Sequence, residues 1–353
     1  MNLCQKSIGV LFCMLFFQLT LAQNNASTLN QFLQTFNDTA TVASDAAPMQ
    51  ADEIMAKKWN QWQTKYFSLN LGLALFLDYN LTEQNETSKT QVGSIADAVE
   101  FRAQRLILSG NLFLTKRPWR YMISFNYNGM DAPQGSKAFS LIDLNLEIPF
   151  GHNGGWITVG KQKEGVGHEY VAPGSQLSFT ERGTAVPSFV KQRNIGFRYS
   201  NSILNHRLAF TIGAFNNALE TANTNSFSAN GYQFTTRATG LVHYKSDRSF
   251  VHVGAGWRYA DAPKNKLSYK AKPETNTAPY FLNTNSFDAQ NAQAYMFELI
   301  GTKGPLSLIS EYMLQIAHTP ESKQSLIIGN VLLVGLLQAK TGNTISRTAM
   351  LAN

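Results

Sequence analysis

The stretch Phe67-Ser-Leu-Asn-Leu-Gly-Leu-Ala-Leu-Phe-Leu-Asp-Tyr79 places a large apolar residue at every second position, with mostly small or polar residues between them. A period of two is typical of a β-strand that has one apolar face. The run is longer than the roughly 5 to 6 residues of an ordinary strand, and it reaches the roughly 9 to 11 residues that a tilted strand needs to cross a bilayer. We therefore expect a membrane-spanning strand with one face toward lipid.

The same alternation recurs along the chain. Turn-rich segments, among them 151–155 and 261–286, separate the alternating runs, so neighbouring strands are expected to be antiparallel. By this criterion we count about eleven strands: 67–79, 100–114, 119–128, 142–148, 156–163, 195–199, 208–214, 231–244, 251–259, 292–302 and 306–315.

The average composition fits a membrane barrel better than a helical membrane protein. The chain has 353 residues, of which 44% are hydrophobic, and its mean hydropathy is -0.19. After the first two dozen residues, no stretch approaches the roughly 18 apolar residues of a spanning helix. Because lumen-facing and lipid-facing residues alternate in a transmembrane β-barrel, such a barrel has a polar average. With no break in composition, we predict one all-β, antiparallel transmembrane barrel over residues 66–318.

The N-terminus has the pattern of an export signal over residues 1–22. Lys6 precedes an apolar run from Ile8 to Leu19, and Thr20 and Ala22 are the small residues expected before a cut. Its removal takes away both cysteines, which excludes disulfides and thiol chemistry in the mature chain. It also lowers the formal charge from +7 to +6. Residues 23–65 show no strand pattern and are interpreted as a periplasmic extension.

Strand parity places several arginines on the face opposite the main apolar series. There they would line a wet lumen and attract anions, because rings of Arg and Lys make pores anion-selective and the guanidinium fork matches phosphate oxygens. An equally good interpretation is that they only form ion pairs with Asp143, Glu147, Glu298 and Glu311 inside the barrel. The arginines are Arg120, Arg198, Arg207, Arg237 and Arg258.

Five spaced segments resemble the phosphate-selective porin O and P family. They are RAQRLILSG at 102–110, LIDLNLE at 141–147, ITVGKQKE at 157–164, RNIGFRY at 193–199 and GPLSLISEY at 304–312. The resemblance implies a 16-stranded barrel, usually a homotrimer, in the outer membrane of a Gram-negative bacterium. It further implies passive diffusion of inorganic anions, phosphate being the solute preferred by some members, with outer-membrane lipid as the surroundings. It implies no cofactor, no metal and no nucleic-acid partner.

The C-terminal segment 319–353 departs from this family pattern and is interpreted as an atypical tail. Its alternation fades after about Pro320, and the chain stops at Leu351-Ala352-Asn353 without an aromatic end. Codons can be chosen for residues 337–343 so that reading two bases later gives Thr-Gly-Glu-Asn-Arg-Lys, which resembles a segment found near the end of family members. We therefore hypothesise a shift of reading frame within residues 319–336, which resequencing of the gene would test.

Two other classes of function were weighed. The six histidines have no metal-ligand spacing, and if His168 and Glu169 lie in a strand they point to opposite faces, so we predict no enzyme activity. The alternative is a secreted, soluble β-sandwich that binds glycans. Trp119 and Tyr127 bracket one strand as in the aromatic girdles of membrane barrels, which favours the bilayer. The proline-containing segment 261–286 is expected to be an extracellular loop able to fold inward as a constriction.

Overall fold

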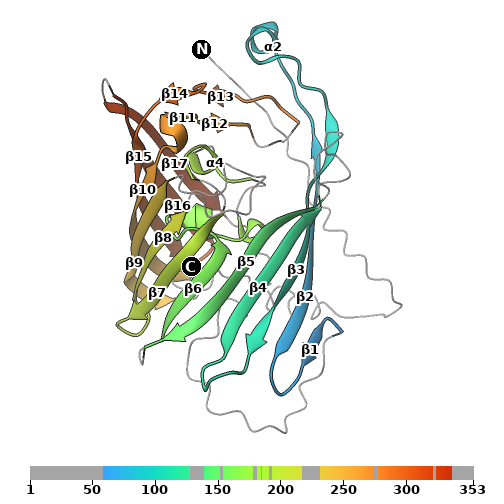
Figure 1. Ribbon diagram of the computed structural model, residues 1–353. Coiled ribbons are helices and arrows are strands. Elements are labelled where there is room, and N and C mark those ends of the chain that lie inside the picture. Colours follow the sequence, from blue (N-terminus) through green and yellow to red (C-terminus); the bar gives the residue numbers. More distant parts are fainter. Residues whose placement is uncertain are drawn as a thin grey trace.

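The computed structural model consists mainly of one antiparallel sheet of thirteen strands (Figure 1). It describes residues 59–127, 139–151, 154–177, 181–183, 185–190, 193–216, 231–273, 275, 277–320 and 323–335. The signal segment 1–22 and most of the extension 23–65 lie outside these ranges, so those two predictions are not tested. The order β1-β2-β3-β4-β5-β6-β7-β8-β9-β10-β15-β16-β17 places each long strand beside its neighbour in sequence. The predicted all-β, antiparallel fold is confirmed.

All eleven predicted strands are present. They are β2 (Ser68–Asn80), β3 (Ala98–Leu112), β4 (Trp119–Tyr127), β5 (Phe139–Phe150), β6 (Gly155–Gln162), β7 (Asn194–Ile203), β8 (Leu208–Asn216), β9 (Tyr232–Ser246), β10 (Ser249–Asp261), β15 (Asn291–Lys303) and β16 (Leu306–His318). The thirteen-stranded sheet has two further strands that were not predicted, the short β1 (Gln61–Gln63) and β17 (Lys323–Gly335). β17 pairs with all of β16 and lies in the segment interpreted as a tail. The frame shift stays a prediction.

The two faces of the sheet differ as the alternation predicted. On β10, His252 and Arg258 point inward and are buried, whereas Val253 between them points outward and is exposed. A single curved sheet with an apolar outer face cannot be a sandwich, which buries that face against a second sheet, so the soluble-sandwich alternative is wrong. Exposed apolar residues cover the outer face: Leu73, Leu75, Leu106, Leu144, Val159, Phe197, Ile212, Phe234, Phe297 and Leu299.

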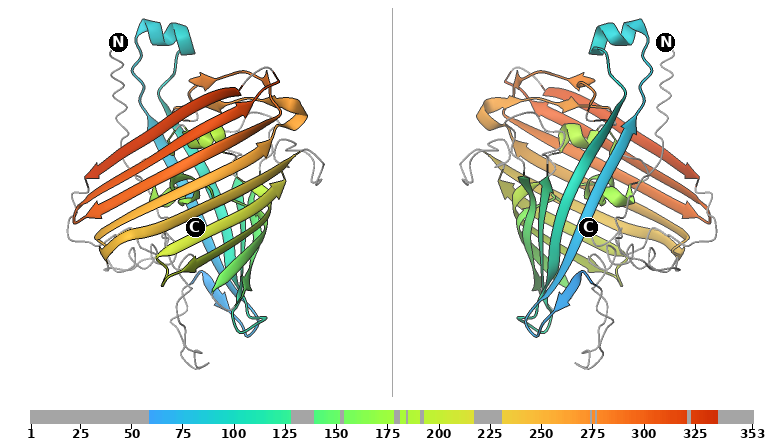
Figure 2. Two further views of the ribbon diagram at one scale, coloured as in Figure 1. Left: turned by 90° about the vertical axis from the view of Figure 1, so that its left-hand side faces the viewer. Right: turned by 90° about the vertical axis from the view of Figure 1, so that its right-hand side faces the viewer.

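The two ends of the sheet are built differently. Short turns join β7 to β8, β9 to β10 and β15 to β16 at one end. In the turn 204–207, Leu204, Asn205 and His206 have φ of 54°, 53° and 60°, which is the left-handed region. Long connections lie at the other end, where β2 and β3 project beyond the sheet and carry α2 (Glu86–Val92) (Figure 2). The side chain of Asn85 caps α2 by accepting from the N–H of Ser88 at 2.8 Å.

The described residues of the segment 163–193 follow β6 and lie inside the curve of the sheet (Figure 1). It contains α3 (His168–Val171), η1 (Gly174–Gln176) and α4 (Ala185–Phe189). We call these residues the inserted segment. His168 and Glu169 therefore begin a short helix, so the argument from opposite faces of a strand does not apply to them. Gly167 has an extended backbone and precedes the helix. Its carbonyl accepts a helical hydrogen bond from the N–H of Val171 at 3.1 Å.

The connection 262–290 packs against the inserted segment. It contains η2 (Pro263–Asn265) and two small sheets, one of β11 (Lys266–Leu267) with β14 (Phe287–Asp288), the other of β12 (Lys270–Ala271) with β13 (Leu282–Asn283). Inward side chains of β15 and β16 complete one apolar core with these two segments. The cluster consists of Val166, Tyr170, Val171, Val186, Phe189, Val190, Tyr269, Ala294, Met296 and Met313. The segment that fills the interior is thus 163–193, with the predicted constriction loop packed on it.

The sheet is open in the described part of the chain, where β17 pairs only with β16 and most of β2 has no partner on its second edge. The sixteen strands that the family resemblance implies are therefore not all present in these residues. None of the helices in the described ranges has the length and apolar character needed to span a membrane.

Phe197→Arg tests the assignment of the outer face to lipid. Phe197 lies mid-strand in β7 and is 56% exposed, and a cation at the bilayer midplane of a barrel costs about 2–4 kcal/mol. We expect that loss of stability in denaturant titrations of protein folded into lipid vesicles. Met122→Arg is the control, because Met122 is 38% exposed but shares the inward face of β4 with Ser124. Equal stability of the two variants would contradict the assignment.

Candidate functional site

A close backbone contact holds the inserted segment against the inner wall. A Cβ atom on Gly256 of β10 would lie 2.2 Å from the carbonyl oxygen of Val166, so only glycine permits this approach. Val166 is 0% exposed. On either side of it, a Cβ on Gly165 would lie 2.7 Å from Thr211, and one on Gly167 would lie 2.5 Å from the carboxylate of Glu311. The Gly-Val-Gly stretch therefore crosses the inner wall from β8 to β16 in direct contact with it.

A buried ion pair fixes the start of this crossing. Arg258 Nε donates to Glu164 Oε2 at 2.7 Å, and Arg258 Nη2 donates to Gln233 at 2.8 Å. Asn194 donates to both Glu164 and Gln233. Glu164 is completely buried. Because a buried carboxylate needs a cation and hydrogen bonds to offset desolvation, Arg258 is committed to holding the inserted segment.

A second buried network occupies the inner faces of β9, β10 and β15. Arg237 donates to both carboxylate oxygens of Glu298, at 2.7 and 2.9 Å. Glu298 also lies 3.3 Å from His252 Nε2. The Glu298 side chain crosses β10 over Gly254, where a Cβ would lie 2.7 Å from its carboxyl carbon. Arg237 is thus paired, as the ion-pair interpretation of the sequence expected.

The other three predicted arginines are distributed over two places. Arg120 Nε lies 2.8 Å from Glu147 and its guanidinium stacks 3.7 Å from the centre of the Trp156 ring. Arg198 reaches the same Glu147 at 3.9 Å. Arg207 lies apart from them, exposed in the turn between β7 and β8. The structure therefore brings Arg120 and Arg198 together, places Arg237 and Arg258 in separate ion pairs, and leaves Arg207 at the rim.

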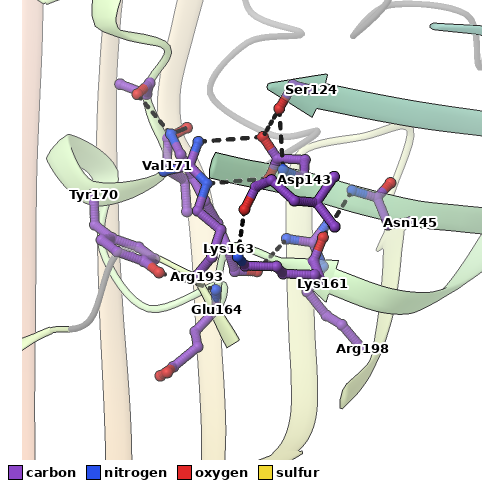
Figure 3. A network of polar contacts seen from close by, with 12 residues as sticks. Ser124, Asp143, Asn145, Lys161, Lys163, Glu164, Tyr170, Val171, Arg193 and Arg198 are labelled. Atoms are coloured by element: carbon purple, nitrogen blue, oxygen red, sulfur yellow. Dashed lines mark hydrogen bonds and ion pairs between the residues drawn. The ribbon is translucent and has the colours of Figure 1, made fainter. Parts of the chain in front are cut away.

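A further group of cations lies between the inserted segment and the inner wall of β3, β4 and β5. We call Arg105, Lys163, Arg182 and Arg193 the basic cluster. Arg193 donates to both oxygens of Asp143, at 3.1 and 3.4 Å (Figure 3). Ser124 donates to the same carboxylate at 2.7 Å and its oxygen accepts from the N–H of Asp143. Asp143 is therefore a fixed anion on which Arg193 is oriented.

Lys163 and Arg182 are held by backbone carbonyls of α3. Lys163 Nζ donates to the carbonyls of Val171 and Ala172 at 2.9 and 3.0 Å. Arg182 donates to the carbonyls of Glu169 and Ala172 at 2.9 and 2.6 Å. Burial, followed by the positive charges of Arg182 and Arg193, holds the pKa of Lys163 well below its ordinary value. Burial and the charge of Arg193 likewise lower the pKa of Arg182. The four cations therefore act electrostatically on one another.

Arg105 is the member of the basic cluster whose donors are least satisfied. Within the described residues, its Nε is buried and meets no acceptor. A buried guanidinium N–H without a partner costs free energy, and an oxyanion would supply the missing acceptor. The charge of Glu181 acts on Arg105, but Glu181 accepts its hydrogen bond from Arg102, at 2.9 Å. Arg102 also donates to Asp78, at 2.5 Å. Glu181 therefore does not by itself supply the acceptor that Arg105 Nε lacks.

Strand parity missed the basic cluster for identifiable reasons. Lys163, Arg182 and Arg193 stand outside the strands, where parity has no meaning. Arg105 stands in β3 beyond an irregularity in its pairing with β2, at Phe76 and Leu77. A signal was nevertheless present, because the family-like runs RAQRLILSG, ITVGKQKE and RNIGFRY contain three of the four cations.

The arrangement can attract and orient an anion, and it offers no other chemistry that we can identify. The four cations of the basic cluster repel one another, and they outnumber the acids that act on them, which are Asp143, Glu181 and Glu169. Such an excess of positive charge is stable when an anion enters. In the parts of the chain that the structure describes, no group of three or more His, Cys, Asp or Glu residues is placed to hold a metal ion.

Comparison with known families identifies the family that the segments described above resemble. The sequence model described as "Phosphate-selective porin O and P" matches residues 69–328, from the first long strand into β17. A search of curated proteins finds no match.

Gly256→Ala tests the contact that seats the inserted segment. The added methyl group would lie 2.2 Å from the Val166 carbonyl, so the segment must move away from β10. We expect faster hydrogen exchange and faster proteolysis within residues 163–177. Gly301→Ala in β15 is the matched control, because no atom of the described residues lies within 4 Å of its Cβ position. Unchanged exchange in Gly256→Ala would contradict the contact.

Proposed function

Because the chain belongs to the phosphate-selective porin O and P family, we propose that it is an outer-membrane porin through which anions, with phosphate foremost, diffuse passively. Family membership supports a channel and not an enzyme. It also supports a Gram-negative outer membrane as the location and a homotrimer as the assembly, and we propose both on that ground.

The observation that carries the anion preference is the basic cluster. Its four cations outnumber the acids given as acting on them, Asp143, Glu181 and Glu169, and Arg105 has a buried N–H that meets no acceptor among the described residues. Arg and Lys lining a channel favour anions, and guanidinium groups match the oxygens of phosphate better than they match chloride. We therefore assign the selective step to Arg105, Lys163, Arg182 and Arg193, with Arg120 and Arg198 as a second group nearer the short turns.

The orientation in the membrane follows from the two ends of the sheet. Outer-membrane barrels have short turns on the periplasmic side and long loops outside. We accordingly place the turn at 204–207 in the periplasm and the connections 81–97 and 262–290 outside. The inserted segment then enters from the outer side, and an anion coming from outside meets the basic cluster before Arg120 and Arg198.

Arg105→Met tests this function. Loss of the unsatisfied guanidinium should lower the anion-to-cation permeability ratio, measured as reversal potential across a planar bilayer under a KCl gradient, and should weaken block of the current by phosphate. Arg207→Met is the control, because it removes the same charge from an exposed turn away from the cluster. Equal reversal potentials for Arg105→Met, Arg207→Met and the unchanged protein would contradict the assignment. A cation-selective unchanged protein would contradict the function itself.

A dependence on pH is expected from Lys163. Burial and the positive charges of Arg182 and Arg193 lower the pKa of Lys163. Lys163 therefore loses its charge at a lower pH than an ordinary lysine, whose pKa is about 10.4. Anion selectivity should therefore be complete below the lowered pKa and should decline as pH rises through it. Lys163→Met should abolish that decline below pH about 10. A decline of the same size in Lys163→Met would assign the titration to another group.

A further inference from the structure

Glu311 has no evident role in the paired networks of the inner wall. It lies on β16 directly across from Glu298 of β15 in the antiparallel register, and it is 7% exposed. Glu298 already has two partners, Arg237 and His252. Among the described residues, Glu311 Oε1 meets no hydrogen-bond donor, although the charge of Arg237 acts on Glu311. Its Oε2 instead accepts the N–H of Glu169, at the start of α3, at 2.9 Å. Two buried carboxylates side by side are costly, so the second requires an explanation.

Glu169 connects Glu311 to the basic cluster. While its N–H is held by Glu311, its carbonyl accepts from Arg182 Nε at 2.9 Å and its carboxylate accepts from the N–H of Gly183 at 2.7 Å. Glu169 therefore forms hydrogen bonds both with the side chain of Arg182 and with the backbone of the next residue, Gly183. The hydrogen bonds form a continuous series, in which Glu311 on β16 binds Glu169 and Glu169 binds Arg182.

The residues around Glu311 and Glu169 allow the two to lie in direct contact. The missing Cβ of Gly167 leaves room for Glu311 Oε1, which would otherwise lie 2.5 Å away. Met296 and Met313 of the apolar core flank the same region of β15 and β16. Because α3 has only four residues, its position depends on such contacts and not on its own helical hydrogen bonds.

We propose that Glu311 is a positioning residue for the anion site, which acts through Glu169 to hold Arg182 in the basic cluster. The inference rests on the proposed function. It assigns the affinity for the anion partly to a carboxyl group on the opposite wall. What matters in Glu311 is a hydrogen-bond acceptor at a fixed place.

The test compares Glu311→Ala with Glu311→Gln. The alanine variant lacks the acceptor, so the phosphate concentration that half-blocks chloride current should rise roughly tenfold, the effect of losing one hydrogen bond to a charged group. The glutamine variant keeps an oxygen acceptor and should stay close to the unchanged protein. Ser307→Ala, on the same face of β16, is the control. Half-block at the same concentration in Glu311→Ala and the unchanged protein would overturn the proposal.

Hydrogen exchange at the Glu169 amide separates this inference from the proposed function. The amide should exchange faster in Glu311→Ala than in Glu311→Gln, whether or not phosphate blocks the channel. Absence of phosphate block in the unchanged protein would refute the proposed function alone, whereas equal exchange in both variants would refute the positioning role. If Glu311→Ala does not fold, Glu311→Met replaces it, because methionine fills a similar volume but offers no oxygen acceptor to the Glu169 N–H. Unchanged phosphate block in Glu311→Met would also overturn the proposal.

Discussion

The contact of the Val166 carbonyl with Gly256 is the constraint on which the interior of this protein depends. It allows a stretch of backbone to lie flat on β10, and the ion pair of Glu164 with Arg258 fixes where that stretch begins. From there the chain must continue toward β16, so α3 and its carbonyls come to lie opposite the inner wall of β3 to β5. The positions of Lys163 and Arg182 follow from this course, since both bind carbonyls of or next to α3.

Charge is divided unequally between the two sides of the inserted segment. On the side of β9, β10 and β15, Arg237 and Arg258 each have a buried carboxylate within hydrogen-bonding distance, and these pairs stabilise the packing. On the side of β3 to β5, cations outnumber the acids that face them, and the Nε of Arg105 meets no acceptor in the part of the chain that the structure describes. The same residue type is therefore structural in one place and available to a solute in another. The difference is set by the neighbouring acids.

Strand positions could be predicted from the sequence because a strand that is apolar on one face has to alternate. β17 was not predicted because consecutive apolar residues replace the alternation in its sequence, Ser-Leu-Ile-Ile-Gly-Asn-Val-Leu-Leu-Val. β1 was not predicted because it is only three residues long. Parity correctly placed Arg237 and Arg258 on the inner face but could not show their partners. Glu164 comes from a segment that has no period at all. Arg207 was misplaced because three residues with positive φ precede it in a turn.

The central claim is that an oxyanion binds among Arg105, Arg182 and Arg193. The most direct measurement is anomalous diffraction from crystals of the protein soaked with selenate, a tetrahedral oxyanion whose selenium can be located without reference to the surrounding chain. The account predicts a selenium peak within hydrogen-bonding reach of Arg105 Nε and the Arg193 guanidinium. Selenium found only at exposed lysines of the connection 262–290, with the basic cluster empty, would contradict it.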